Sequence, residues 1–238
     1  EALNEWRFPQ GTALIEHVEV PVSSNGAVRL NTLVQLKQAS GWQLFNYQWN
    51  SAQTDAVLID QTQVVSINQW VSGSTQTRSH SVIAGGVCSG DCRTVGGMLW
   101  NTAQLNKVVS YDGQVYNQIA LLAELSVFDD YIPDLTNARA FVNPYDSSAD
   151  LDERARVYLD VNCAGCHADS NGKNMAYGVS LPGSGLVWAA SNPGTYRIHP
   201  GDASDSSIYL RQNSTTPGDR MPRGSAHIDA AGVQLMAE

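Results

Sequence analysis

Residues 163–167, which read C-A-G-C-H, constrain this chain more than any other feature of the sequence. Two thiols three positions apart lie on adjacent turns of a short helical segment, where both can add to the vinyl groups of one haem. The histidine that follows at once is placed to bind the iron as the proximal ligand. The pattern therefore predicts a single covalently attached haem c, held by Cys163, Cys166 and His167.

A zinc knuckle, or a redox dithiol beside a chance histidine, is the alternative interpretation of this motif. Zinc needs two more Cys or His ligands at close spacing, and the next histidine, His199, lies far downstream. The pattern favours haem, which is attached to this motif outside the cytoplasm. We therefore expect a periplasmic or secreted protein.

Charge narrows the choice of partners. Among the 238 residues, 14 Lys and Arg stand against 23 Asp and Glu, for a net charge of −9. Nucleic acids and anionic membranes attract a basic face, so neither is an expected partner. No apolar run approaches the length of a membrane span. The expected partners are redox proteins with a basic or neutral surface.

The first half of the chain has the period-2 pattern of an antiparallel β-meander. Apolar and polar residues alternate over 28–37, and Ser40 with Gly41 then marks a turn. The other expected strands lie at 14–20, 42–50 and 56–67. In the strand over 42–50, Phe45, Tyr47 and Trp49 share one face. This half is therefore predicted to be β-rich.

Helical spacing replaces this pattern in the second half. Apolar residues recur at helical intervals over 117–128, and a polar linker follows at 143–148. Asp150 and Glu153 form a capping-box-like start for a helix that leads directly into Cys163. We predict two domains, a β-rich one over 1–147 and a haem domain over 148–238.

The order of features after residue 148 is a helix, the C-x-x-C-H motif, a long wrap, a methionine and a final helix. In this order residues 148–238 resemble a class I c-type cytochrome. The resemblance implies an all-α fold and a distal methionine beside a proline, which Met221 and Pro222 match. A thioether ligand stabilises Fe(II) relative to Fe(III) and so raises the potential.

Other residues compete with Met221 or complete the predicted pocket. Met175 and Met236 are interpreted as packing residues and Met98 lies in the other domain, whereas His199 and His227 keep bis-His ligation open. The resemblance implies that the Pro182 carbonyl accepts the proximal histidine N–H. Donors available for the haem propionates are Arg220, Arg211, Arg197, Trp188 and Tyr196, each arginine being equally well explained as a solvated charge.

A second cysteine pair, Cys88 and Cys92, has Arg93 where a haem ligand would stand. An oxidising compartment favours a short-range disulfide between these two cysteines. Segments such as 6–12 and 47–50 give the chain a wider resemblance to exported bacterial di-haem c-type cytochromes. That resemblance implies that the first haem site is lost here and one haem remains.

These observations predict an electron-transfer protein rather than an enzyme. A mono-haem carrier with His and Met ligands would pass single electrons between partners such as a dehydrogenase or a polysaccharide-active copper oxygenase. Five of the six tryptophans precede residue 148, which leaves open a carbohydrate- or partner-binding module with an appended haem domain. A haem peroxidase is the third alternative, and it requires an open iron position with distal acid–base groups.

Overall fold

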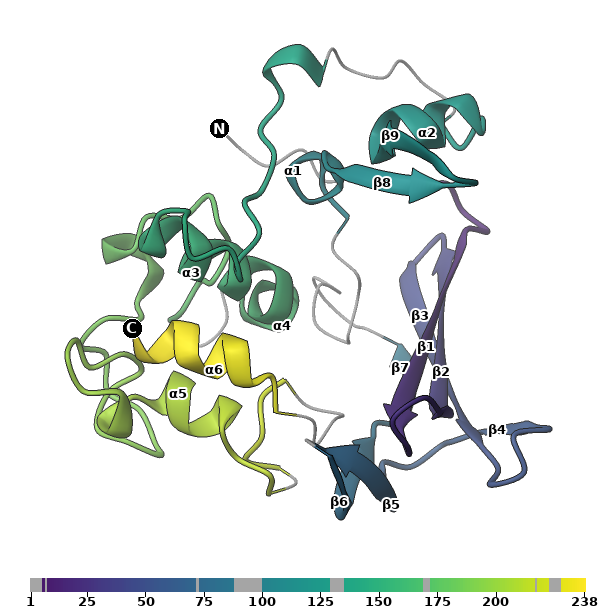
Figure 1. Cartoon of the computed structure of the whole chain (residues 1–238), viewed down its shortest axis with the longest axis horizontal. Helices are drawn as coiled ribbons and strands as arrows, with labels where there is room; N and C mark the ends of the chain where they lie inside the picture. The colour runs from purple at the N-terminus through teal and green to yellow at the C-terminus, as the bar shows by residue number, and fades with distance from the viewer. Residues whose placement is uncertain are drawn as a thin grey trace.

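The computed structural model describes residues 6, 8–71, 73–87, 100–128, 135–168, 172–216, 218–222 and 228–238. Figure 1 shows β-strands on one side of the molecule and the four C-terminal helices on the other, with a small hairpin-and-helix unit above the strands. The C-terminal helices are short and are joined by long irregular segments.

An antiparallel sheet forms the N-terminal part. Its strands β1 (Ala13–Pro21), β2 (Ala27–Gln38), β3 (Gly41–Trp49) and β4 (Ala56–Leu58) pair in chain order, and β7 (Gly86–Val87) also pairs with β3. The period-2 pattern and the turn at Ser40 and Gly41 predicted these first three strands, and the structure confirms the β-meander. Alternation along β3 puts Phe45, Tyr47 and Trp49 on one face of the sheet and Trp42 on the other.

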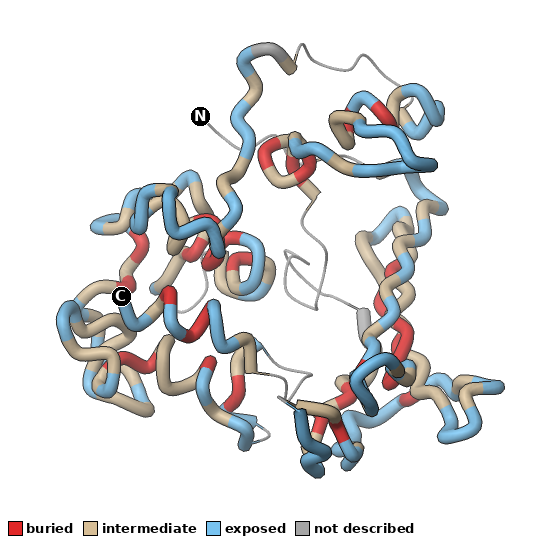
Figure 2. The backbone as a smooth tube through the Cα atoms, in the orientation of Figure 1, coloured by how far each residue is buried: buried red, intermediate tan, exposed pale blue. Residues whose placement is uncertain are grey.

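The predicted strand over 56–67 is wrong as a single element. It divides into β4 and β5 (Gln63–Val71), which pairs with β6 (Ser74–Val82) in a separate two-stranded sheet. The polar residues 60–62 separate the two strands, and Ile59 between them is buried. Ile59 packs with Val20, Leu30 and Val82, so the break folds the hairpin onto the sheet and forms the core seen in Figure 2.

A smaller unit follows, comprising α1 (Thr102–Leu105), the hairpin of β8 (Val108–Tyr111) and β9 (Gln114–Asn117), and α2 (Gln118–Glu124). Asp112 and Gly113 form the hairpin turn with φ values of 48° and 73°, the left-handed conformation that this pair favours. The side chain of Asn117 caps α2 by accepting from the Ile119 and Ala120 N–H groups. The predicted helix is therefore present but shorter than 117–128.

The prediction of an all-α class I cytochrome fold for residues 148–238 is wrong. The described helices are α3 (Leu151–Leu159), α4 (Gly165–His167), α5 (Ser207–Gln212) and α6 (Ala230–Ala237), with a π-helical turn at Asp160–Ala164. Gly and Pro residues recur between α4 and α5, and they interrupt helices because proline removes an N–H and glycine costs backbone entropy. Isolated bridges such as Val187 with Ile198 order this stretch instead.

Phe141, just before the predicted linker, contacts both the N-terminal and the C-terminal part of the chain. The N–H of Phe141 donates to the Ala103 carbonyl at 2.9 Å, and the Phe141 ring lies 4.9 Å from that of Tyr177. The boundary at residue 147 stays a prediction. None of the helices in the described ranges has the length and apolar character needed to cross a membrane.

Candidate functional site

Helix α3 leads directly into the segment that carries the C-A-G-C-H motif. The Asp150 carboxylate accepts from the Glu153 N–H at 3.1 Å, which confirms the predicted start of this helix. The π-helical turn then places Cys163 just before α4, which ends at His167. Such turns inside α-helices are frequent at functional sites. One helical run therefore carries both cysteines and the histidine.

An apolar cluster surrounds the first cysteine. Leu159, Ala164, Met175 and Leu186 are buried together, and Cys163 packs against them with Ala176, Ile198, Ile208 and Met236. The Met175 N–H donates to the His167 carbonyl at 3.0 Å, so this methionine is attached to the end of the motif. Met175 and Met236 thus occupy the packing positions that the sequence predicts for them.

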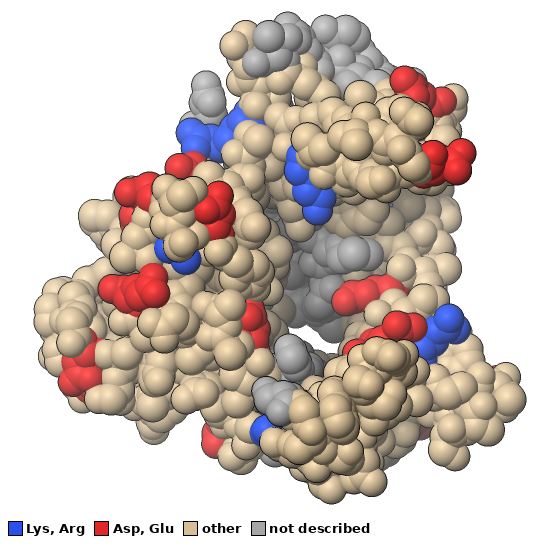
Figure 3. All heavy atoms as spheres, in the orientation of Figure 1, with Lys and Arg blue, Asp and Glu red and all other residues tan. Residues whose placement is uncertain are grey.

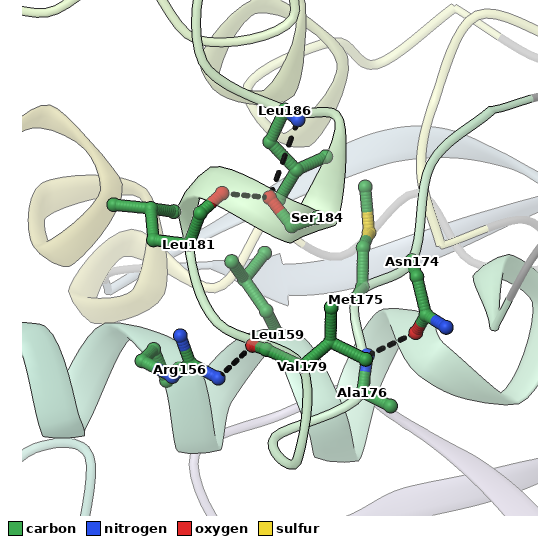
Figure 4. Close-up of a pocket in the computed structure, with 9 residues that line it drawn as sticks. All are labelled: Arg156, Leu159, Asn174, Met175, Ala176, Val179, Leu181, Ser184 and Leu186. Carbon is green, nitrogen blue, oxygen red and sulfur yellow. Dashed lines mark hydrogen bonds between the residues drawn. The ribbon is translucent and has the colours of Figure 1, made fainter.

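Figure 4 shows a small pocket beside this cluster. Leu159, Met175 and Leu186 contribute apolar side chains, and the Ser184 hydroxyl donates to the Leu181 carbonyl at 2.6 Å. The same hydroxyl accepts the Leu186 N–H, which fixes the backbone next to the buried Leu186. The pocket's volume is about 10 Å³, so it accommodates no more than roughly one water molecule.

The two cysteines have different surroundings. Both carry thiols, but Cys163 is partly buried whereas Cys166 is exposed. Burial, and secondarily the nearby Cys166, raises the pKa of the Cys163 thiol to about 12. The apolar side of the motif therefore lies at Cys163 and its solvent side at Cys166.

Arginine side chains hold the irregular loops after the motif. Arg197 Nη1 donates to the carbonyls of Gly172 and Gly185, at 2.6 and 2.7 Å. Arg156 donates in the same way to Tyr177 and Val179, the second of which is visible in Figure 4. Carbonyls without helix or sheet partners need such donors. Pro182 begins a short 3₁₀ turn, Pro182–Ser184, and is exposed.

Met221 lies in a loop that is bonded to α5. Its N–H donates to the Arg211 carbonyl at 3.1 Å, while Arg211 Nη1 donates to the Asp219 carbonyl at 3.1 Å. Arg211 Nη2 reaches the Asn192 carbonyl at 2.8 Å. The neighbouring Arg220 is buried, and desolvation lowers its pKa.

Positive charge gathers close to these loops. Burial and the charges of Arg197 and Arg211 together lower the pKa of Lys173. These three cations contrast with the acidic side chains that Figure 3 shows across the C-terminal part. They form a locally basic region suited to carboxylates.

Trp188, Tyr196 and His199 form an aromatic cluster whose ring centroids lie 4.9–5.2 Å apart. Trp188 has a φ of 58°, which is rare for a bulky residue, and it is 55 % exposed. His199 Nδ1 lies 2.9 Å from the Asp205 carboxylate. The Thr195 N–H, and secondarily His199, lowers the pKa of Asp205. The predicted donors Trp188 and Tyr196 are therefore adjacent.

One carboxylate that sequence reasoning missed joins three segments. Asp229 Oδ2 accepts from the hydroxyls of Tyr145 and Tyr158, at 2.6 and 3.0 Å, and Oδ1 accepts the Gly232 N–H at the start of α6. Its position just before the final apolar helix is the N-cap signal that was available in the sequence. No local pattern indicated the two tyrosines.

Several predicted residues lie outside the described ranges, namely Cys88, Cys92, Met98 and His227. The predicted disulfide therefore stays a prediction. Among the residues with described coordinates, no group of three or more His, Cys, Asp or Glu is placed to hold a metal ion.

Comparison with known proteins finds no relative: no family model, no curated protein and no solved structure matches the chain. The resemblances to class I cytochromes and to exported di-haem cytochromes are therefore wrong as family assignments. Apart from C-x-x-C-H, the motifs behind these two resemblances are weak. The structure has short helices over residues 148–238, where the all-α class I cytochrome fold was expected.

Proposed function

We propose that the chain is an extracytoplasmic mono-haem c-type electron carrier. Cys163 and Cys166 would attach the haem covalently, with His167 as proximal ligand and Met221 as distal ligand. The observation that carries this proposal is the single helical run that ends in two thiols and a histidine beside an apolar cluster. A bound haem supplies a one-electron Fe(II)/Fe(III) couple, whose potential a methionine ligand raises.

The surroundings of the motif fit a haem on three counts. Cys163 faces apolar side chains, as the attached edge of a porphyrin requires. Lys173, Arg197 and Arg211 supply positive charge in an acidic chain, which suits two propionates. Arg211 links the Met221 backbone to α5, and Ile208 of α5 packs against the same buried cluster as Cys163. Contacts through α5 therefore connect the Met221 loop with the cysteine motif.

Two protein ligands would close the coordination sphere, which favours electron transfer over catalysis at the iron. Partners would be redox proteins, and the net charge of −9 favours a basic or neutral docking face on them. A carbohydrate-binding role has less support because the tryptophans of the N-terminal half have other contacts. Trp49 donates to Thr32 at 2.8 Å with Arg29 over its ring, and Trp42 packs on Phe8.

The test is expression with a haem-attachment system, followed by intact mass and optical spectroscopy. We expect one added haem, low-spin spectra and the weak methionine–iron band in the red. M221A should lose that band and have a lower potential, while M175A should keep the band. A mass without haem would refute the proposal. A high-spin spectrum that responds to peroxide or cyanide would favour the peroxidase alternative.

A further inference from the structure

The loop that carries Met221 is anchored through one residue of α5. The Arg211 carbonyl accepts the Met221 N–H, and the Arg211 guanidinium donates to the Asp219 carbonyl two residues before Met221. A carbonyl in the last turn of a helix lacks an intrahelical partner, so the loop and the helix end satisfy each other. Backbone and side chain of one residue thus bind the same short loop.

Arg211 and the helix that carries it, α5, also join this loop to two other parts of the fold. Its second guanidinium nitrogen donates to the Asn192 carbonyl at 2.8 Å. Helix α5 itself is bonded to the preceding segment, since the Ile208 N–H donates to the Arg197 carbonyl at 3.2 Å. Because Ile208 and Cys163 pack against the same buried apolar cluster, a short path of contacts leads from the cysteine motif to Met221.

We infer that Arg211 is a positioning residue that holds Met221 ready to bind the haem iron, an inference that rests on the proposed function. A thioether is a neutral, weak ligand. Its occupancy of the iron therefore depends on how little freedom the loop loses when it binds, as for any preorganised ligand. Holding the loop at two points, the Asp219 carbonyl and the Met221 N–H, restricts that freedom before the bond forms.

Arg197 provides a matched control within the same chain. It also donates to two backbone carbonyls and contributes to the same basic region, but its carbonyl partners are Gly172 and Gly185. Loss of Arg197 removes equal charge and two similar hydrogen bonds without touching the Met221 loop. A comparison of R211Q with R197Q therefore separates positioning of Met221 from general loosening or loss of propionate contacts.

The experiment titrates imidazole, which competes with the methionine for the distal position, into the haem-loaded protein and its variants. The methionine–iron band and the Soret shift report displacement, and intact mass reports haem content. We expect R211Q to bind imidazole about tenfold more tightly than wild type, which corresponds to about 1.4 kcal/mol. R211K keeps the charge without the planar guanidinium group, and its affinity for imidazole should lie between those of wild type and R211Q. R197Q also removes a proposed propionate partner, and it should shift the affinity much less than R211Q does.

Three results would overturn the inference. If R211Q and R211K titrate as wild type does while M221A loses the band, Met221 is the ligand but Arg211 does not position it. If R197Q shifts as far as R211Q, the effect is general loosening. If M221A keeps the band, the proposed distal ligand is wrong and the role of Arg211 falls with it.

Discussion

Replacing Asp229 should weaken the C-terminal part of the chain far more than replacing a typical surface carboxylate. Asp229 caps α6 through the Gly232 N–H and accepts two tyrosine hydroxyls from distant segments. Loss of an N-cap costs about 1 kcal/mol, and a hydrogen bond to a charged group contributes about 1.5–3 kcal/mol. Tyr145 is half exposed, so its bond belongs at the low end. We expect D229A to lower the free energy of unfolding by roughly 4–5.5 kcal/mol.

Further variants divide this loss into its parts. D229N keeps a good helix cap, because Asn and Asp are equivalent at that position. It removes the charge that strengthens the two tyrosine hydrogen bonds, so it should lower the free energy of unfolding by only about 1–2 kcal/mol. Y158F should cost more than Y145F because Tyr158 is buried. Asp60 is exposed, and D60N is the matched control. Urea unfolding at neutral pH, followed by far-UV circular dichroism, measures each difference.

The same cluster sets a pH dependence. Burial, with the Asp229 hydrogen bond and charge, raises the pKa of Tyr145 to about 12, and burial and Asp229 also raise the pKa of Tyr158. Both hydroxyls titrate near pH 10 when unfolded. Their contribution to stability is therefore complete below about pH 10 and declines as the pH rises toward the folded pKa values. Y145F and Y158F should each reduce that alkaline decline.

Two results would refute this reasoning. The first is a D229A urea midpoint equal to that of D60N, which would mean that the three bonds contribute nothing measurable. The second is an alkaline decline in the double variant Y145F/Y158F that is as steep as in wild type. The decline would then come from other groups.

Two further predictions concern the motif and α6. In chain made in the cytoplasm, without attached haem, iodoacetamide should modify the exposed Cys166 well before Cys163, as peptide mass spectrometry will show; equal rates would contradict the burial of Cys163. G232A should destabilise the protein although alanine favours helices by about 1 kcal/mol, because a Cβ there would lie 2.2 Å from the Tyr158 hydroxyl. In a Y158A background, which lacks both the hydroxyl and the ring carbon 2.3 Å from that Cβ, G232A should lower the urea midpoint less than it does in wild type. An equal loss in both backgrounds would reject the clash.

Local patterns predicted β1 to β3 and α3. Alternation identified β1 to β3 because one face of each strand is more buried than the other. The Asp150 cap and apolar spacing identified α3 for the same kind of reason. The β8–β9 hairpin was missed although Asp112 and Gly113 are a strong turn signal. Each strand of this hairpin has only four residues, too few for an alternating pattern to stand out.

The long loops between α4 and α5 could not be read in this way. Their order comes from side chain to carbonyl bonds across 12 to 25 residues, such as those of Arg197. No periodicity records which carbonyl a guanidinium will reach. The resemblance to a class I cytochrome implied an all-α fold for residues 148–238, and that prediction was wrong.

The sequence by itself determined the chemistry available to this protein, because two thiols and a histidine at fixed spacing depend only on residue type and on the pitch of one helix. Tertiary structure decided how that motif is surrounded: which thiol is buried, where positive charge gathers, and which helix holds the Met221 loop. Those properties depend on contacts between segments far apart in the chain, whose energies arise from burial and from hydrogen bonds that no local pattern encodes.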